Sequence, residues 1–146
     1  MAVKITRVKL WQAEIPNKPG ALSATLEPFA KARTDLKVVM KYSIPGRSSR
    51  ATIEIYPGKG KSAEHAAKTA GFSLSPTPVL LLKGTNRKGL SYNLANTFAW
   101  AGISVRFLSV QVIGKEYTAL IGFKTEGEAR EATSLIRLVT AGKKAV

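Results

Sequence analysis

Two short turns carry the residue types best suited to binding a small anion. Each has an Asn, a basic residue, one intervening residue and a Gly directly before a helical pattern. A strand that enters a helix through a tight glycine turn leaves backbone N–H groups unpaired at the helix start, where the peptide dipoles create partial positive charge. A carboxylate suits such a place. The residues are Asn17, Lys18, Pro19, Gly20, Ala21 and Leu22 in the first turn, and Asn86, Arg87, Gly89 and Leu90 in the second.

The same residues also have a purely structural explanation. Gly20 and Gly89 permit a sharp strand-to-helix junction, and Asn17 and Asn86 can hydrogen-bond to their own backbone. The residue types alone leave both explanations open.

Catalytic and metal chemistry find little support in the composition. The chain has no cysteine, which excludes disulfides, thiolate zinc sites and cysteine nucleophiles. His65 is the only histidine, and a single histidine without an organised carboxylate forms neither a triad nor a metal site. The nine acidic residues are scattered, so no convergent acid–base pair is indicated. We expect no enzyme activity, no catalytic residue, no metal ligand and no cofactor.

The charge balance leaves a second function class open. A net charge of +14 raises affinity for nucleic acid and other polyanions without specifying a site. The outward face of residues 50–56 offers one aromatic side chain, whereas RNA-recognition sheets stack bases on two or three. Nucleic-acid or anion binding is therefore the alternative. No apolar run approaches the ~18 residues that span a bilayer, so we expect a soluble cytoplasmic protein and no membrane partner.

The order of predicted elements repeats along the chain. The first copy has a strand over 5–15, a helix after Gly20 that Pro28 should kink, strands over 36–44 and 51–56, a helix over 62–70 and an extended piece over 72–75. The second copy has a strand over 79–83, a helix over 90–101, strands over 103–113 and 116–123, and a helix over 128–138 with Thr125 as N-cap. Its final strand is short or missing.

Alternation along the strands suggests which faces are buried. In the 36–44 strand, Leu36, Val38, Met40, Tyr42 and Ile44 should form the core face. The strands predicted over 103–113 and 116–123 have apolar residues at both odd and even positions, so a layer is expected to cover each face of their sheet. Edge-to-edge pairing of the two copies into one wide sheet, and back-to-back dimerisation, would provide it. We therefore expect a homodimer or larger even-numbered oligomer with Leu108, Val110 and Val112 near its two-fold axis.

The Asn-Lys-Pro-Gly-Ala-Leu turn, the helix ends Ala30-Lys31-Ala32 and Ala99-Trp100-Ala101-Gly102-Ile103, and the tandem repetition resemble ACT domains, small regulatory modules that commonly bind amino acids. The resemblance covers most of the chain. It implies an α+β fold of two ferredoxin-like βαββαβ repeats, with antiparallel sheets and helices on one face. The expected repeats are residues 1–75 and 76–146.

The resemblance also implies a function. A non-catalytic regulatory module would bind a free amino acid where ACT units meet, through the two turns named above, and would act on an enzyme that the sequence does not identify. Two positions depart from the family pattern. The position that is most often acidic is Asn in both turns, and Lys88 stands where the family has Pro. Asn retains an acceptor oxygen for an ammonium group, whereas Lys88 loosens the second turn.

Overall fold

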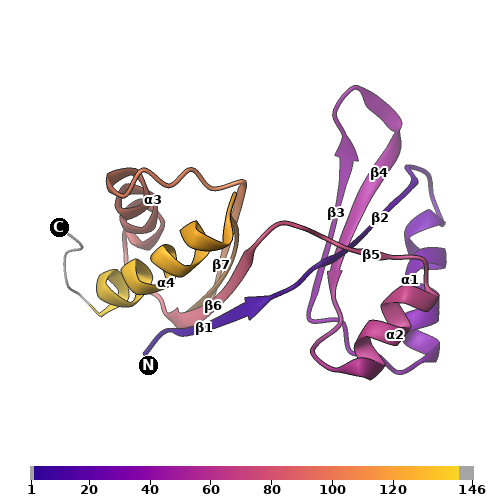
Figure 1. The fold of residues 1–146 in the computed structure, drawn as a ribbon, viewed down its shortest axis with the longest axis horizontal. Helices are drawn as coiled ribbons and strands as arrows, with labels where there is room; N and C mark the ends of the chain where they lie inside the picture. The colour runs from indigo at the N-terminus through magenta and orange to yellow at the C-terminus, as the bar shows by residue number, and fades with distance from the viewer. Residues whose placement is uncertain (1, 142–146) are drawn as a thin grey trace. The chain divides into compact units, whose positions relative to one another are not determined.

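The computed structural model describes residues 2–141, which form two compact units. One comprises Lys9–Pro76 and is called here the continuous unit. The other, the split unit, combines residues 2–8 with residues 77–141. Each unit has one four-stranded antiparallel sheet with two helices against it (Figure 1). The expected α+β fold of two ferredoxin-like repeats is confirmed.

The continuous unit has the strand order β3-β4-β2-β5. Its elements are β2 (Trp11–Pro16), α1 (Ala21–Lys31), β3 (Val38–Ile44), β4 (Arg47–Tyr56), α2 (Lys61–Thr69) and β5 (Ser73–Leu74). The core forms where Ile53 and Ile55 of β4 meet Phe29 of α1 and Ala67 of α2. Because Ala67 is small, α2 can pack closely on the sheet.

The split unit has the strand order β1-β6-β8-β7. Its elements are β1 (Lys4–Val8), β6 (Val79–Thr85), α3 (Leu90–Trp100), β7 (Phe107–Ile113), β8 (Glu116–Gly122) and α4 (Glu126–Thr140). The predicted N-cap of α4 is confirmed, since the Thr125 hydroxyl accepts from the Glu128 N–H at 3.1 Å. Among the described residues, no helix is long and apolar enough to cross a membrane.

The first predicted strand is divided between the two sheets. β1 pairs antiparallel with β6, whereas β2 pairs with β4 and β5. In the continuous unit, β5 forms the sheet edge beside β2. In the split unit, β1 forms the equivalent edge beside β6, and so it replaces the final strand that the second repeat lacks. The continuous unit ends at Pro76, and residues 2–8 belong to the split unit together with the second repeat. The repeat bounds 1–75 and 76–146 stay a prediction. In residues 5–15 the buried apolar residues fall on both even and odd positions, because Val8 belongs to β1 in one sheet whereas Trp11 and Ile15 belong to β2 in the other.

The predicted core face was wrong within β3, although Leu36, which precedes the strand, packs against the core. Val39 and Lys41 lie opposite Ile55 and Ile53, so they share the helix-covered face, and Val38, Met40 and Tyr42 lie on the other face. β3 is an edge strand, where neither face is fully covered. Alternation therefore indicates a strand there without indicating its buried side.

The expected packing of the β7 strand also needs correction. Leu108, Val110 and Val112 lie opposite Ile121, Ala119 and Tyr117, which are core residues on the helix side. They do not line the back of the sheet. The two repeats also form separate four-stranded sheets and not one wide sheet. The face of β7 is set by its register with β8. The separation of the two sheets agrees with the pairing of β1 with β6, which occupies one edge of the second sheet.

Pro28 does not break α1. The helix runs from Ala21 to Lys31 across this residue, and the Pro28 carbonyl accepts from the Ala32 N–H at 3.0 Å. The expected kink stays a prediction. In α3, Trp100 is 69% exposed and lies outside the core.

Candidate functional site

Both predicted turns place a glycine in the left-handed region directly before a helix. Gly20 has φ 86° and precedes α1, and Gly89 has φ 82° and precedes α3. This backbone conformation is inexpensive only for glycine and, to a lesser degree, for Asn and Asp. Space for a side chain nevertheless exists, because a Cβ on Gly20 would meet no heavy atom within 4 Å.

The first turn of α1 presents unpaired backbone donors. The Ala21 N–H donates to the Lys18 carbonyl at 3.2 Å, and the Ala24 N–H donates to the Gly20 carbonyl at 3.0 Å. The N–H groups of Leu22 and Ser23 lie between them and have no intrahelical acceptor. No side chain caps this helix, and no acidic residue lies in its first turn.

The first turn of α3 repeats this geometry. The Leu90 N–H donates to the Arg87 carbonyl at 3.1 Å, and the Asn93 N–H donates to the Gly89 carbonyl at 2.9 Å. Again no side chain caps the helix and no acidic residue lies in its first turn. The two helix starts are thus polarised in the same way and lack a built-in anion.

Basic side chains accompany both turns. Lys18 is exposed beside Gly20, and Arg87 and Lys88 are exposed beside Gly89. Their charges add to the positive ends of the helix dipoles, so both turns favour an anionic group.

Asn17 is held by the β3–β4 hairpin. Its Nδ2 donates to the Ser48 carbonyl at 2.9 Å and to the Ser43 hydroxyl at 3.1 Å, and its Oδ1 accepts from Lys41 Nζ at 2.7 Å. The Asn17 backbone N–H donates to the Ser49 carbonyl at 2.9 Å. The amide oxygen expected to receive a ligand ammonium group therefore already has a cationic donor.

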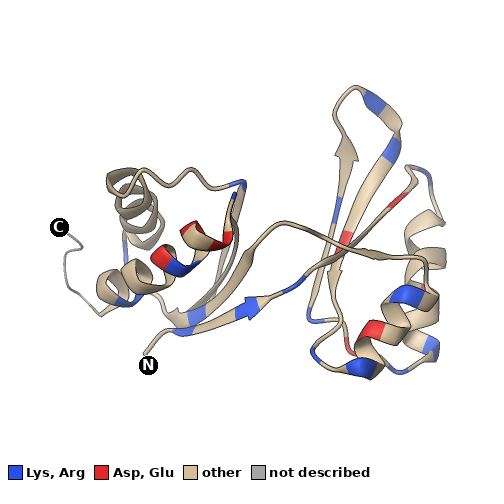
Figure 2. Cartoon of the chain, in the orientation of Figure 1, with Lys and Arg blue, Asp and Glu red and all other residues tan. Residues whose placement is uncertain are grey.

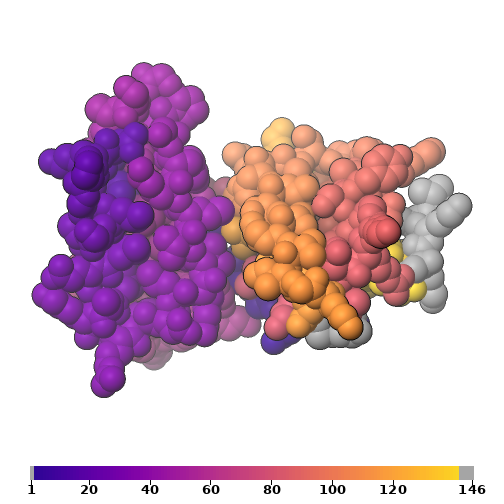
Figure 3. Space-filling model, turned by 180° about the vertical axis from the view of Figure 1, so that it is seen from behind, coloured from indigo at the N-terminus to yellow at the C-terminus, as the bar shows by residue number. Residues whose placement is uncertain are grey.

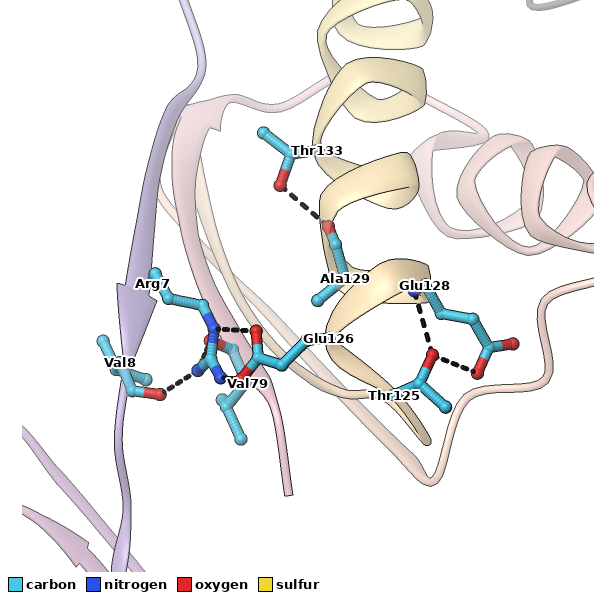
Figure 4. Close-up of polar contacts among 8 residues, drawn as sticks. All are labelled: Arg7, Val8, Val79, Thr125, Glu126, Glu128, Ala129 and Thr133. Carbon is cyan, nitrogen blue, oxygen red and sulfur yellow. Dashed lines mark hydrogen bonds and ion pairs between the residues drawn. The ribbon is translucent and has the colours of Figure 1, made fainter. Parts of the chain in front are cut away.

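A solvent-open cavity of about 270 Å³ lies in the split unit, and none of the turn residues lines it. It is formed by β1, β6 and α4 and is lined by Ile5, Arg7, Leu80, Glu126, Ala129, Arg130 and Thr133. Figure 4 shows Arg7 pointing from β1 toward Glu126 at the start of α4.

Most donors of Arg7 are already used. Nη1 donates to the Val8 carbonyl at 2.7 Å and to the Val79 carbonyl at 3.1 Å, and the Nε and Nη2 groups donate to the Glu126 carboxylate. Four of the five guanidinium hydrogens are therefore accounted for. This arrangement indicates that Arg7 holds β1 against β6 and α4, which is a structural role.

Comparison with known structures shows which fold positions these turns. BT0572 from Bacteroides thetaiotaomicron is 17% identical with a TM-score of 0.71, covering 89% of this chain and 88% of that chain. The aspartokinase alpha and beta subunits are 15% identical with a TM-score of 0.60, covering 93% and 95%. The ligand-free regulatory subunit of aspartate kinase from Thermus thermophilus is 13% identical with a TM-score of 0.60, covering 94% and 93%. No family model and no curated protein matches the sequence.

The chain has a tandem ACT-domain fold. In this fold the two turns hold equivalent positions, since each follows the strand that precedes the first helix of its repeat. The Asn86 N–H donates to the Lys115 carbonyl at 2.9 Å, as the Asn17 N–H does to Ser49. Both turns are thus tied to the hairpin of their own ACT repeat.

The two asparagine side chains differ within this shared frame. The side-chain amide of Asn86 has no hydrogen-bond partner within residues 2–141, and the residue is half-buried. The structural explanation of the turn therefore fits the Asn17 side chain better than the Asn86 side chain. The second turn, with Lys88 in place of Pro, leaves its amide available to a ligand.

Sequence reasoning missed one polar pair in the first ACT repeat. The Tyr42 hydroxyl of β3 donates to the Glu54 carboxylate of β4 at 3.2 Å on the face away from the helices. Burial raises the pKa of Glu54, although the Tyr42 hydrogen bond lowers it. Burial and the neighbouring Glu54 charge raise the pKa of Tyr42 to about 12. No local pattern signals this pair, because it depends on strand register.

Proposed function

We propose that this chain is a non-catalytic regulatory module that binds a free amino acid at its strand-to-helix turns. The observation that carries the proposal is the duplicated helix start: two equivalent turns, each with a left-handed glycine, unpaired N–H groups, no side-chain cap and no acidic residue in the first turn. The fold shared with a regulatory subunit of aspartate kinase supports a regulatory role.

The proposed ligand pose follows from the free donors. The ligand carboxylate accepts from the N–H groups of Leu22 and Ser23 at the first turn, or of Ser91 and Tyr92 at the second. The Asn86 amide oxygen is an acceptor for the ammonium group at the second turn. At the first turn the Asn17 oxygen accepts from Lys41, so the ammonium group would share or displace that donor.

A matched pair of substitutions at each glycine tests this pose. Gly20→Asp and Gly20→Asn place side chains of nearly equal size in the same left-handed conformation, so both variants carry the same strain. Only Asp adds a negative charge beside the ligand carboxylate. At a separation of 4–6 Å, repulsion of ~1.4 kcal/mol or more corresponds to at least about tenfold weaker binding. Gly89→Asp and Gly89→Asn test the second turn.

The measurement is a calorimetric screen of the twenty amino acids against the purified chain, followed by titration of the four variants. We expect an amino acid to bind, and binding at an occupied turn to be weaker for Asp than for Asn. No binding by any amino acid would exclude the proposed ligand class. Equal affinities of the Asp and Asn variants at both turns would place the site elsewhere.

The charge of +14 favours nucleic acid as the second candidate ligand. Such binding would weaken steeply between 50 mM and 300 mM salt, whereas an amino acid held by backbone donors would be affected far less. Titration of a mixed-sequence oligonucleotide at both salt concentrations separates the two candidates.

Assembly and location complete the proposal. A regulatory module needs a partner, which is either a regulated enzyme or a second copy of the chain in an even-numbered oligomer. We also propose a cytoplasmic location, which is where free amino acids and biosynthetic enzymes meet. Light scattering of the purified chain, and fractionation of cells that express it, test these two points.

A further inference from the structure

The cavity of the split unit has an apolar floor. β1, β6 and α4 supply its apolar lining residues, which are Ile5, Leu80 and Ala129. Leu80 is 2% exposed and Ala129 is 1% exposed, and both belong to the hydrophobic core of the unit. Hydrocarbon groups of a ligand placed on this floor would leave water, which favours binding. The floor is therefore suited to an aliphatic group.

Three charged side chains form the rim of the cavity: Arg7, Glu126 and Arg130. Glu126 and Arg130 are four residues apart on α4, a spacing that commonly gives an ion pair. Glu126 pairs with Arg7 instead, since Arg7 Nε and Nη2 donate to the two oxygens of its carboxylate. Within residues 2–141, the Arg130 guanidinium has no hydrogen bond and no ion pair. The rim, with two arginines and one glutamate, therefore has an unpaired positive charge.

The Arg130 side chain lies over the first turn of α4. Its Nη2 atom is 4.0 Å from the position that a Cβ on Gly127 would take. Figure 2 shows red and blue residues close together along this helix, whereas α3 has neither. In Figure 3, which shows the split unit from behind, α4 (yellow) is largely hidden. The α4 wall of the cavity thus lies on the side of the unit that Figures 1 and 2 show.

The start of α4 does not itself attract an anion. Thr125 caps the helix, and Glu126 and Glu128 lie in its first turn. These two carboxylates offset the positive end of the helix dipole. A ligand anion in the cavity would therefore depend on Arg130, whereas the pose proposed at the two turns depends on backbone N–H groups.

We propose that the cavity binds an aliphatic monocarboxylate, with its carboxylate on Arg130 and its hydrocarbon tail on the apolar floor. A guanidinium and a carboxylate form two parallel hydrogen bonds, and one negative charge balances the unpaired charge of the rim. At roughly 30 Å³ for each water-sized group, about 270 Å³ holds up to about nine such groups. 4-Methylpentanoate, with six carbons and two oxygens, is within this limit. The inference goes beyond the amino-acid site proposed at the turns and does not depend on it.

The rim discriminates against the amino acid of the same shape. Leucine is 4-methylpentanoate with an ammonium group next to the carboxylate. That group would lie beside Arg130, and Glu126, the acidic residue of the rim, already has both oxygens engaged by Arg7. Because like charges at this separation repel, we expect leucine to bind in the cavity at least about tenfold more weakly than 4-methylpentanoate.

Calorimetric titration of the full chain with 4-methylpentanoate, acetate and leucine measures these preferences. Acetate keeps the carboxylate but has no tail for the floor, so it should bind at least about tenfold more weakly than 4-methylpentanoate. Amide NMR shifts show where each ligand binds. We expect 4-methylpentanoate to shift the signals of Ala129, Arg130 and Thr133. An amino acid bound at the turns would instead shift those of residues 21–23 or 90–92, so the two sites are tested separately.

A matched pair of arginine substitutions on α4 tests the anchor. Arg130→Met keeps most of the side-chain length and removes the guanidinium, and it should weaken 4-methylpentanoate binding at least about tenfold. Arg137→Met is the control, because Arg137 is exposed on the same helix, carries the same charge and does not line the cavity. It should leave the affinity unchanged. Thr133→Leu, which adds volume inside the cavity, should weaken binding as well.

Several results would overturn the proposal. One is the absence of 4-methylpentanoate binding to the wild-type chain at millimolar concentration. Another is equal weakening by Arg130→Met and Arg137→Met, which would indicate non-specific attraction to a chain of charge +14. NMR shifts confined to the two turns, or leucine bound in the cavity as tightly as 4-methylpentanoate, would also exclude it.

Discussion

Tyr117 of β8 offers a sharp test of the packing described above, because its hydroxyl is buried without a partner. The side chain is 1% exposed, and its hydroxyl has no hydrogen bond. The ring lies over Gly84 of β6, where a Cβ would be only 2.8 Å from Tyr117 Cε1. Glycine at this position therefore makes room for the aromatic ring, whereas the matching pair in the other sheet is Ile15 opposite Ala51.

Tyr117→Phe removes the unpaired hydroxyl and keeps the ring. A buried polar group without a partner costs about 1–3 kcal/mol. After allowing for the packing contacts that the oxygen makes, we expect the free energy of unfolding of the split unit to rise by about 1 kcal/mol. For a unit of roughly 70 residues this corresponds to an increase in Tm of about 6 °C.

Tyr42→Phe is the matched control and should have the opposite sign. The Tyr42 hydroxyl donates to the Glu54 carboxylate at 3.2 Å, so its removal leaves a buried carboxylate with one hydrogen bond fewer. We expect destabilisation by about 1–3 kcal/mol, confined to the continuous unit. Urea unfolding followed by hydrogen exchange of each unit separates the two effects. A Tyr117→Phe variant less stable than the wild type would refute the reasoning and would indicate an ordered water on that hydroxyl.

Two further perturbations follow from the polar contacts. Because burial raises the pKa of Glu54 above 4.5, the folded state binds this proton more tightly than the unfolded chain, and its contribution to stability is lost as pH rises above 4.5. Glu54→Gln should therefore be more stable than the wild type at pH 7, with the difference shrinking toward pH 4.5 in urea titrations; a constant difference would contradict this assignment. Arg7→Met removes the donors that reach Val8, Val79 and Glu126. It should lower the free energy of unfolding of the split unit by about 1–2 kcal/mol and make amide hydrogen exchange in β1 faster. Unchanged amide exchange in β1 would mean that backbone pairing alone holds the strand.

Features set by local sequence were predicted well. The glycines before α1 and α3, the Thr125 cap of α4 and the short extended piece at β5 depend on a few neighbouring residues, and the structure contains all of them. The duplication was also readable, because the same turn recurs at the same place in both repeats.

Features set by pairing between distant segments were not predictable. The 5–15 segment reads as one strand, and nothing in its own residues shows that Val8 faces Val79 while Trp11 faces Leu74. The side chain of Asn17 has the same local surroundings as that of Asn86, yet only Asn17 has Lys41 within reach across the hairpin. Edge strands such as β3 carry a weak burial signal, so their buried face could not be assigned from alternation.

The placement of β1 sets an order of events during synthesis. Its partner β6 begins 71 residues after Val8, and the whole continuous unit lies between them. A chain that emerges from its N-terminus can complete the continuous unit while β1 still lacks its partner. Closing the second sheet then requires β1 to be captured across the whole continuous unit. Even for a flexible loop, the entropic cost of closure grows only slowly with loop length. Moving residues 2–8 to follow α4 would remove this wait and give the split unit a continuous sequence, as the continuous unit already has.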